Sequence, residues 1–337
     1  MNKSIIFILL TLVLISLGWW GNDKYQKLLK NVDYQKSISL IKPLEKYSIE
    51  NLRSTEIKPV KIKLEEKINS NNIFTSNIFS FEFDPTLKNK NNKKVTGLIN
   101  LPVKSSLSPV VVLLRGYVDQ SIYQTGGGTK RVGEFFAENG YITLAPDFLG
   151  YGGSSEESGN IFETRFQTYT TVLTLLKSIN QENIPMWDGK NIFIWAHSNG
   201  GQVALTTLEI TGADYTTVLW APVTKPFPYS ILYYTDESQD EGKFIRKELA
   251  NFEKNYDVNK YSLTNYLDKI NAPIEYHLGT NDDAIPLSWG DEFVSRMKKL
   301  EKEVTYYKHP GADHNMNPLW GDVMQKTLEF FATKSKD

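Results

Sequence analysis

Six short, continuous apolar runs, separated by segments of helical pattern, constrain the fold of this chain more than any other feature. Each run is rich in Val, Ile, Leu and aromatic residues. They occupy residues 110–115, 141–146, 191–196, 216–222, 274–280 and 304–310. Strands of this type are buried on both faces, as in a parallel sheet covered by helices. The intervening segments predict the covering helices, at Lys130–Asn139, Phe162–Asn180, Gly200–Thr211, Pro286–Lys302 and Pro318–Thr333.

Upstream of these runs, the pattern alternates between apolar and polar residues. Residues 60–66, 78–83 and 94–100 show this alternation, which is typical of half-exposed antiparallel strands. The polar segment that begins at Asp84 predicts a hairpin turn. Antiparallel strands followed by alternating strands and helices indicate the α/β class, with a mostly parallel, doubly wound sheet. We therefore predict one domain over residues 59–337.

One connection in this pattern is too long for a simple loop. The chain from Pro222 to Pro273 contains no run of the strand type. Its first part is crowded with aromatic residues, namely Phe227, Tyr229, Tyr233 and Tyr234. Long insertions in compact domains are usually functional or disordered, and the aromatic content favours order. We predict a helical lid over about residues 223–270.

The N-terminus carries a separate signal. Residues 5–20 are almost wholly apolar, as in the hydrophobic region of a signal peptide or a short membrane anchor. Paired tryptophans at its end suit a membrane interface, whereas a small-x-small triplet within it would fit a cleavage site. We assign residues 1–21 to a signal peptide or to a membrane anchor. Either places the domain outside the cytoplasm, anchored to the membrane or secreted. Residues 22–58 are polar and predict a stalk with one or two short helices.

Composition excludes several classes of function. The formal net charge is -1, so the chain has no overall basic field to attract nucleic acid. Cysteine is absent, which excludes disulfides, Cys-ligated zinc and cysteine nucleophiles. No grouping of His, Asp and Glu has the spacing of a metal site. We expect neither a metal nor a cofactor.

The segment 191–210 carries the strongest chemical motif. A buried strand that ends near Trp195 is followed by a turn with Ser198, and a helix begins at Gly200. This is the context of a nucleophile elbow, a strained turn that projects a serine hydroxyl above the strand ends. The residues on either side, Ala196 and Gly200, are small, as the close approach of strand and helix requires. Ser198 is the predicted nucleophile.

A serine hydroxyl needs a base to accept its proton and an acid to orient that base. In this context the acid and then the histidine follow the serine, each after a later strand. Of the four histidines, His314 alone lies in a loop after the last strand, and it is the predicted base. Asp282 follows the strand at 274–279, and we prefer it to Asp283 as the acid.

The other histidines receive structural interpretations, and the backbone supplies the remaining chemistry. We expect His197 to be turned away from the site, His277 to lie in the core and His309 to lie at the surface. Acyl transfer also needs N–H donors for the tetrahedral oxyanion. The backbone N–H groups of Asn199, after the nucleophile, and of Tyr117, after the strand at 110–115, are predicted to supply them.

Several segments, in order along the chain, resemble those of α/β-hydrolases: KVTGLINLP, VVVLLRGY, APDFLGYGGSS, AHSNGG, GTNDDAIP and GADH. More narrowly, they are similar to the catalytic domain of the prolyl oligopeptidase family and its dienelactone-hydrolase-like relatives, over roughly residues 94–333. The resemblance implies the α/β-hydrolase fold and a covalent acyl-enzyme at Ser198, and it supports Asp282. Three features depart from the pattern. Ala196 replaces the first elbow glycine, Arg115 stands where many relatives have histidine, and a β-propeller is absent.

These observations predict a serine hydrolase that acts on a short peptide or a small-molecule ester. Peptide hydrolysis of the prolyl oligopeptidase type is the first prediction. A carboxylesterase or acyl hydrolase is the alternative, and a catalytically inactive binding module is a third possibility. The sequence leaves the oligomeric state open.

Overall fold

The computed structural model describes residues 42–88, 90–103, 106–238 and 240–336. The predicted signal or anchor at 1–21, and residues 22–41 of the predicted stalk, therefore lie outside the described residues. Within the described ranges, no helix is both long and apolar enough to cross a membrane.

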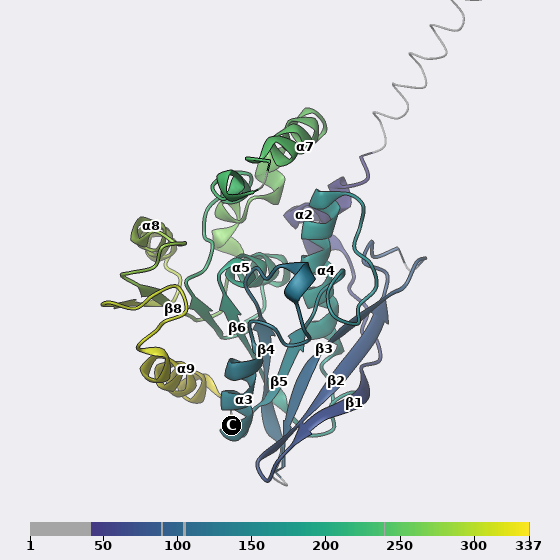
Figure 1. The fold of residues 1–337 in the computed structure, drawn as a ribbon, viewed down its shortest axis with the longest axis vertical. Helices are drawn as coiled ribbons and strands as arrows, with labels where there is room; N and C mark the ends of the chain where they lie inside the picture. The colour runs from purple at the N-terminus through teal and green to yellow at the C-terminus, as the bar shows by residue number, and fades with distance from the viewer. Residues whose placement is uncertain (1–41, 89, 104–105, 239, 337) are drawn as a thin grey trace, which may run out of the picture.

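A single mixed sheet of nine strands forms the centre of the described chain (Figure 1). The strands are β1 Lys63–Ser70, β2 Phe74–Phe83, β3 Lys93–Pro102, β4 Ser108–Leu114, β5 Ile142–Pro146, β6 Trp187–His197, β7 Thr217–Trp220, β8 Ile274–Gly279 and β9 Val304–His309. Their order is β1-β2-β3-β5-β4-β6-β7-β8-β9. The strand pairs β1–β2, β2–β3 and β3–β5 are antiparallel. All pairs from β5 to β9 are parallel.

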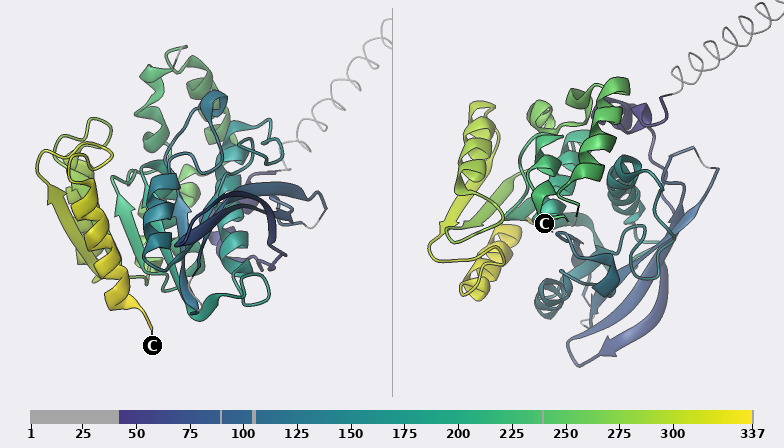
Figure 2. Two further views of the ribbon diagram at one scale, coloured as in Figure 1. Left: turned by 60° about the horizontal axis from the view of Figure 1, so that its bottom comes forward. Right: turned by 45° about the horizontal axis from the view of Figure 1, so that its top comes forward.

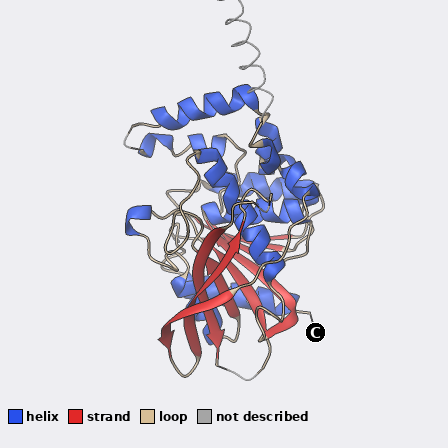
Figure 3. Cartoon of the chain, turned by 90° about the vertical axis from the view of Figure 1, so that its right-hand side faces the viewer, coloured by secondary structure: helices blue, strands red, loops and turns tan. Residues whose placement is uncertain are grey.

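Helices cover both faces of this sheet, as the buried strands require. The longer helices are α3 Lys130–Glu138, α4 Ile161–Ser178, α5 Asn199–Thr211, α8 Leu287–Lys299 and α9 Trp320–Lys334. Helices α3 and α9 lie on one face, and α4, α5 and α8 lie on the other (Figure 1). Figure 3 shows the twist of the strands between these layers, and Figure 2 shows β1 and β2 as a long curved hairpin at one edge. Because the strands that carry the predicted site residues run parallel, their carboxyl ends meet at one edge of the sheet.

The part of the predicted stalk that the structure describes is folded into the domain. Residues 45–47 form a 3-10 turn, and α2 (Ile49–Ser54) follows it directly. Leu44, Tyr47, Ile49 and Leu52 are buried in the main hydrophobic cluster, and α2 packs against α5. Residues 42–58 thus contain the short helices that were predicted, but they pack into the domain and do not form a separate stalk. Four apolar side chains are too few to show a helical period, but they are enough to anchor one helical turn.

The insertion between β7 and β8 is helical, as predicted. It contains α6 (Tyr229–Leu232), α7 (Lys243–Asn255) and several 3-10 turns. Helix α7 stands outside α4 and α5 on the same face of the sheet (Figure 2). Phe227 and Phe252 hold the insertion to α4, because their rings lie 5.9 Å and 5.0 Å from that of Phe162. A lid function for this insertion stays a prediction.

Helix α5, which begins at the predicted nucleophile, contains a buried carboxyl group beneath α2. Glu209 is fully buried, and neither of its carboxyl oxygens has a hydrogen-bond partner among the described residues. Its main-chain carbonyl accepts a hydrogen bond from the guanidinium of Arg53. Burial raises the pKa of Glu209 well above its usual value, and the nearby Asp268 adds to this effect. The side chain is therefore held in the neutral form.

We expect Glu209→Gln to make stability less dependent on pH on the alkaline side. The folded protein holds a proton on Glu209 that the unfolded chain loses above its lower pKa, so the stability of the wild type falls as pH rises. The variant lacks this dependence. The free energy of unfolding of the variant, relative to that of the wild type, should rise by about 1.4 kcal/mol per pH unit. This rise ends at the pKa of Glu209 in the folded protein. Urea unfolding at pH 6.5 and 8 measures this difference. The exposed Glu253→Gln is the control, and parallel pH dependence of the Glu209 variant and the wild type would contradict the prediction.

Candidate active site

The predicted nucleophile lies in a strained turn between β6 and α5. Strand β6 ends at His197, α5 begins at Asn199, and Ser198 between them has φ 54° and ψ -121°. A positive φ in a residue with a side chain costs about 1–3 kcal/mol and persists where the surroundings fix it. Here the Ser198 N–H donates to the carbonyl of Trp220 (3.0 Å), and its own carbonyl accepts from Gly201 and Val223 (both 3.0 Å). The turn is thus tied to β7 and to the first turn of α5.

Two glycines allow the backbone to close around this turn. A Cβ on Gly200 would lie 2.1 Å from the carbonyl oxygen of Leu114, so α5 can start against the end of β4 only without a side chain there. A Cβ on Gly116 would lie 2.9 Å from Cβ of Ser198. The loop after β4 is therefore in contact with the nucleophile turn. Ala196, which stands where the G-x-S-x-G pattern has its first glycine, is fully buried, so the turn accommodates its small side chain.

The structure brings Asp282 and His314 together, and it distinguishes the two candidate acids. Nδ1 of His314 lies 3.0 Å and 2.9 Å from the two carboxyl oxygens of Asp282. The Asp282 side chain is fully buried, and its Oδ1 also accepts from the N–H groups of Ala284 and Ile285 at 2.9 Å and 2.7 Å. Asp283 is exposed. A buried carboxylate at Nδ1 leaves Nε2 of His314 as the ring nitrogen available to a serine.

The hydroxyl of Ser198, the third predicted member of this group, is not hydrogen-bonded to His314 in the structure. The hydrogen bonds of the described residues do not include one between the Ser198 hydroxyl and His314. Such bonds are often long in enzymes without substrate and tighten in the substrate complex. His197, the residue before the serine, makes the contact between the two loops, because its ring centroid lies 4.6 Å from that of His314.

His197 has a role that the sequence did not predict. Its Nε2 lies 3.0 Å from the carbonyl oxygen of His314. Burial, with a smaller contribution from the neighbouring His314, lowers the pKa of His197 to about 4, so at neutral pH the ring is uncharged. Since the partner is a carbonyl, Nε2–H must be the donor. The expectation that His197 turns away was wrong, because it fastens the His314 loop to the nucleophile turn.

Arg115 supports the loop that carries the predicted second N–H donor. Its guanidinium is buried, and it donates to the carbonyls of Gly116 (2.9 Å) and Asp147 (3.2 Å). It also lies 4.0 Å from the ring centroid of Tyr151 and 4.7 Å from that of Tyr123. The sequence marked Arg115 only as a departure from relatives. In the structure it braces the backbone that leads to the N–H of Tyr117.

A buried chain of three side chains lies behind the acid and base loops. Glu275 Oε1 is 2.8 Å from Nε2 of His277, whose Nδ1 is 2.9 Å from Nε2 of His309. Burial raises the pKa of Glu275 to about 8 and lowers those of His277 and His309 to about 3 and 4. All three side chains are therefore uncharged near pH 7. The surface position expected for His309 was wrong. Its carbonyl accepts from Thr280 (3.0 Å) and Ala312 (3.2 Å) and so joins the two loops.

Comparison with known protein families identifies the family of this chain. The model of the prolyl oligopeptidase family matches residues 129–337, which is more than half of the chain. The chain belongs to the prolyl oligopeptidase family. It is a serine hydrolase, as predicted. Within the described ranges, no group of three or more His, Asp or Glu side chains is placed to hold a metal ion.

The proteins to which this chain is similar in sequence or in structure include esterases and a peptidase. An acetyl esterase of Xylanibacter ruminicola is 23% identical over 220 residues, which are 59% of this chain and 48% of that protein. The chain thus spans about half the length of this relative. Acetyl xylan esterase 1 of a Thermoanaerobacterium species has a TM-score of 0.63 at 14% identity, covering 87% of this chain and 94% of that one. An acylaminoacyl peptidase of Pyrococcus horikoshii has a TM-score of 0.55 at 16% identity, over 84% and 51%. Both structures confirm the α/β-hydrolase fold.

Proposed function

We propose that this protein is a carboxylic ester hydrolase that removes short acyl groups from an alcohol. Ser198 is the nucleophile, His314 the general base and Asp282 the acid that orients His314. The backbone N–H groups of Asn199 and Tyr117 bind the oxyanion. Ester hydrolysis was the alternative in the sequence analysis, where peptide hydrolysis was the first prediction.

The cavity beside the two N–H donors carries this proposal. It has a volume of about 130 Å³, and Tyr117, Phe148, Leu149, Asn199 and Val203 are among the residues that line it. Polar residues such as Glu157 and Gln167 line it as well. Its apolar side chains can contact a short acyl chain, and its small volume limits the length of that chain. The name of the Xylanibacter ruminicola relative, an acetyl esterase, supports the same preference.

The reaction follows from the placement of these groups. His314 Nε2 accepts the proton of the Ser198 hydroxyl as the oxygen attacks the acyl carbon, and the carbonyl oxygen becomes an oxyanion. Collapse of this intermediate breaks the ester bond, and His314 returns the proton to the leaving alcohol. Water then attacks the acyl-enzyme, and His314 accepts its proton. The bond between the acyl carbon and the Ser198 oxygen breaks, His314 returns the proton to that oxygen, and the carboxylic acid leaves. The buried Asp282 stabilises the imidazolium that forms in each half-reaction.

Acyl-chain selectivity tests the proposal. We expect kcat/KM to be highest for p-nitrophenyl acetate and to fall at least tenfold for the octanoate, because the longer chain exceeds the cavity. Matched acyl-amino-acid and proline p-nitroanilides measure peptidase activity in parallel. A higher kcat/KM on an anilide than on the acetate would overturn the ester assignment in favour of the peptidase. A preference for the octanoate would contradict the assignment of the cavity.

A further inference from the structure

The peptide bond between Gly116 and Tyr117 carries the second N–H group that is proposed to bind the oxyanion. This peptide lies against the nucleophile turn, because a Cβ on Gly116 would lie 2.9 Å from Cβ of Ser198. Tyr117 and Asn199, the two proposed donors, both line the cavity of about 130 Å³. The hydrogen bonds of the described residues do not include one donated by the N–H of Tyr117. This N–H is therefore available to a substrate oxygen.

Arg115 binds the opposite side of the same peptide unit. Its guanidinium donates to the carbonyl oxygen of Gly116 at 2.9 Å. The bond between Gly116 and Tyr117 is not among the cis peptide bonds of the described residues. Its C=O and N–H groups therefore lie in one plane and point in opposite directions. Because Arg115 fixes the direction of the carbonyl, it also fixes the direction of the Tyr117 N–H.

The charge of Arg115 affects the strength of this donor as well as its direction. A hydrogen bond from a cation is stronger than one from a neutral donor. Such a bond draws electron density toward the carbonyl oxygen of the peptide, and hydrogen bonds linked in this way polarise one another. The N–H of Tyr117 thereby becomes more positive. It then binds more strongly the negative charge that develops on the substrate oxygen in the transition state.

The surroundings of Arg115 hold the guanidinium in this position. Arg115 is 7% exposed, and the ring centroids of Tyr151 and Tyr123 lie 4.0 Å and 4.7 Å from it. Its second carbonyl partner is Asp147, at 3.2 Å, whereas the carboxylate of Asp147 accepts from the hydroxyl of Tyr123 at 2.6 Å. Burial of a cation is costly unless hydrogen bonds compensate for it. Here the bonds that compensate include the one to the peptide of Tyr117.

We propose that Arg115 is a positioning residue for oxyanion binding, which orients and polarises the peptide between Gly116 and Tyr117. This inference rests on the proposed function, because it deepens the role that Tyr117 has there. It concerns esters and amides alike, since both react through a tetrahedral oxyanion. Arg115 itself does not touch the reacting atoms, and its effect reaches them through the N–H of Tyr117.

The affinity for a tetrahedral analogue tests this inference. Phenylboronic acid adds to an active serine as a tetrahedral boronate and so resembles the transition state. We expect Arg115→Met to lower both kcat/KM for p-nitrophenyl acetate and the affinity for the boronic acid at least tenfold, by factors that agree within threefold. Loss of a whole oxyanion donor lowers kcat by about 10²–10³-fold, whereas here the donor stays but is less well oriented. The acid limb of the pH profile of kcat/KM, which reports the base, should not move.

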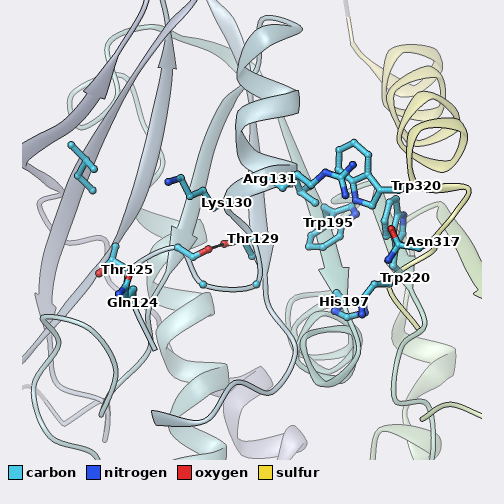
Figure 4. Close-up of a pocket in the computed structure, with 16 residues that line it drawn as sticks. Gln124, Thr125, Thr129, Lys130, Arg131, Trp195, His197, Trp220, Asn317 and Trp320 are labelled. Atoms are coloured by element: carbon cyan, nitrogen blue, oxygen red, sulfur yellow. Dashed lines mark hydrogen bonds between the residues drawn. The ribbon is translucent and has the colours of Figure 1, made fainter. Parts of the chain in front are cut away.

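Two further variants make the comparison specific. Arg115→Lys keeps a cation between the two tyrosine rings but lacks the planar fork of arginine, so we expect smaller losses that are again parallel. It covers the case in which Arg115→Met does not fold. The matched control is Arg131→Met, because Arg131 also lies against an aromatic ring, 3.7 Å from the centroid of Trp320 (Figure 4). Neither Ser198 nor His314 lines the cavity beside Arg131, so this variant should keep the wild-type values.

The outcomes separate this inference from the ester assignment. A loss of kcat/KM without a loss of boronate affinity would overturn the role of Arg115. Wild-type values in folded Arg115→Met, or in Arg115→Lys where the methionine variant does not fold, would overturn it too. If the wild type binds the boronic acid but cleaves only anilides, the ester assignment fails, and the same comparison on the best anilide still tests Arg115. If the wild type neither binds the boronic acid nor cleaves any of these substrates, both proposals fail.

Discussion

Ser198→Ala is expected to lower kcat for p-nitrophenyl acetate by about 10⁶-fold, the loss seen when a serine hydrolase loses its nucleophile. The variant keeps the oxyanion N–H groups but cannot form the acyl-enzyme. A fluorophosphonate probe, which reacts only with an activated serine, should label the wild type and not the variant. Gel fluorescence and ester kinetics on the same preparations measure both effects.

The control for this variant is its folding. Alanine adopts the strained backbone of Ser198 no more readily than serine does, so equal thermal unfolding temperatures would show that the turn is retained. Labelling that persists in a folded Ser198→Ala protein would place the nucleophile at another residue. Absence of labelling in the folded wild type would instead favour a binding module, the third interpretation of the sequence.

Much of the site could be predicted because its parts are fixed by local sequence. The buried run at 191–196 and the small residues around Ser198 specify a strand, a turn and a helix without reference to the rest of the chain. The acid and base follow later buried strands, and parallel strands place their carboxyl ends at one edge. The order of these segments was therefore enough to bring Asp282 and His314 together, as the structure shows.

The residues that the sequence missed act through contacts between distant segments. His197 binds the His314 loop, which is 117 residues away in the sequence. His309 was assigned to the surface from its neighbour Pro310, but its partner His277 lies on the adjacent strand. Arg115 depends on aromatic rings from two other loops. No local period or spacing encodes such contacts, because they arise only when the loops pack.

The same limit explains the error at the N-terminal side of the domain. Residues 42–58 are mostly polar, and their four buried apolar side chains show no sustained period. Their burial depends on a groove that α4 and α5 form much later in the chain. Tyr47, for example, donates to Glu163 on α4 at 2.9 Å. Without those helices the segment has the composition of a solvated linker.

Asp282→Asn is expected to lower kcat for ester hydrolysis by about 10⁴-fold, the loss found when the acid of a serine triad becomes an amide. The asparagine fills the same buried space, but its amide can present an N–H to Nδ1 of His314. That arrangement favours the tautomer with the proton on Nε2, which cannot accept the proton of Ser198. Single-turnover measurements should show slower acylation and slower deacylation, because His314 acts as the base in both half-reactions.

The chain offers a matched control for this change in the next residue. Asp283 has the same side chain but is exposed, so Asp283→Asn should change kcat by less than twofold. If the structure assigned the wrong carboxylate, the two variants would exchange their effects. If both retained activity, His314 would not depend on a carboxylate at Nδ1. The contacts of 2.9 Å and 3.0 Å between Asp282 and His314 would then serve only to hold the loop.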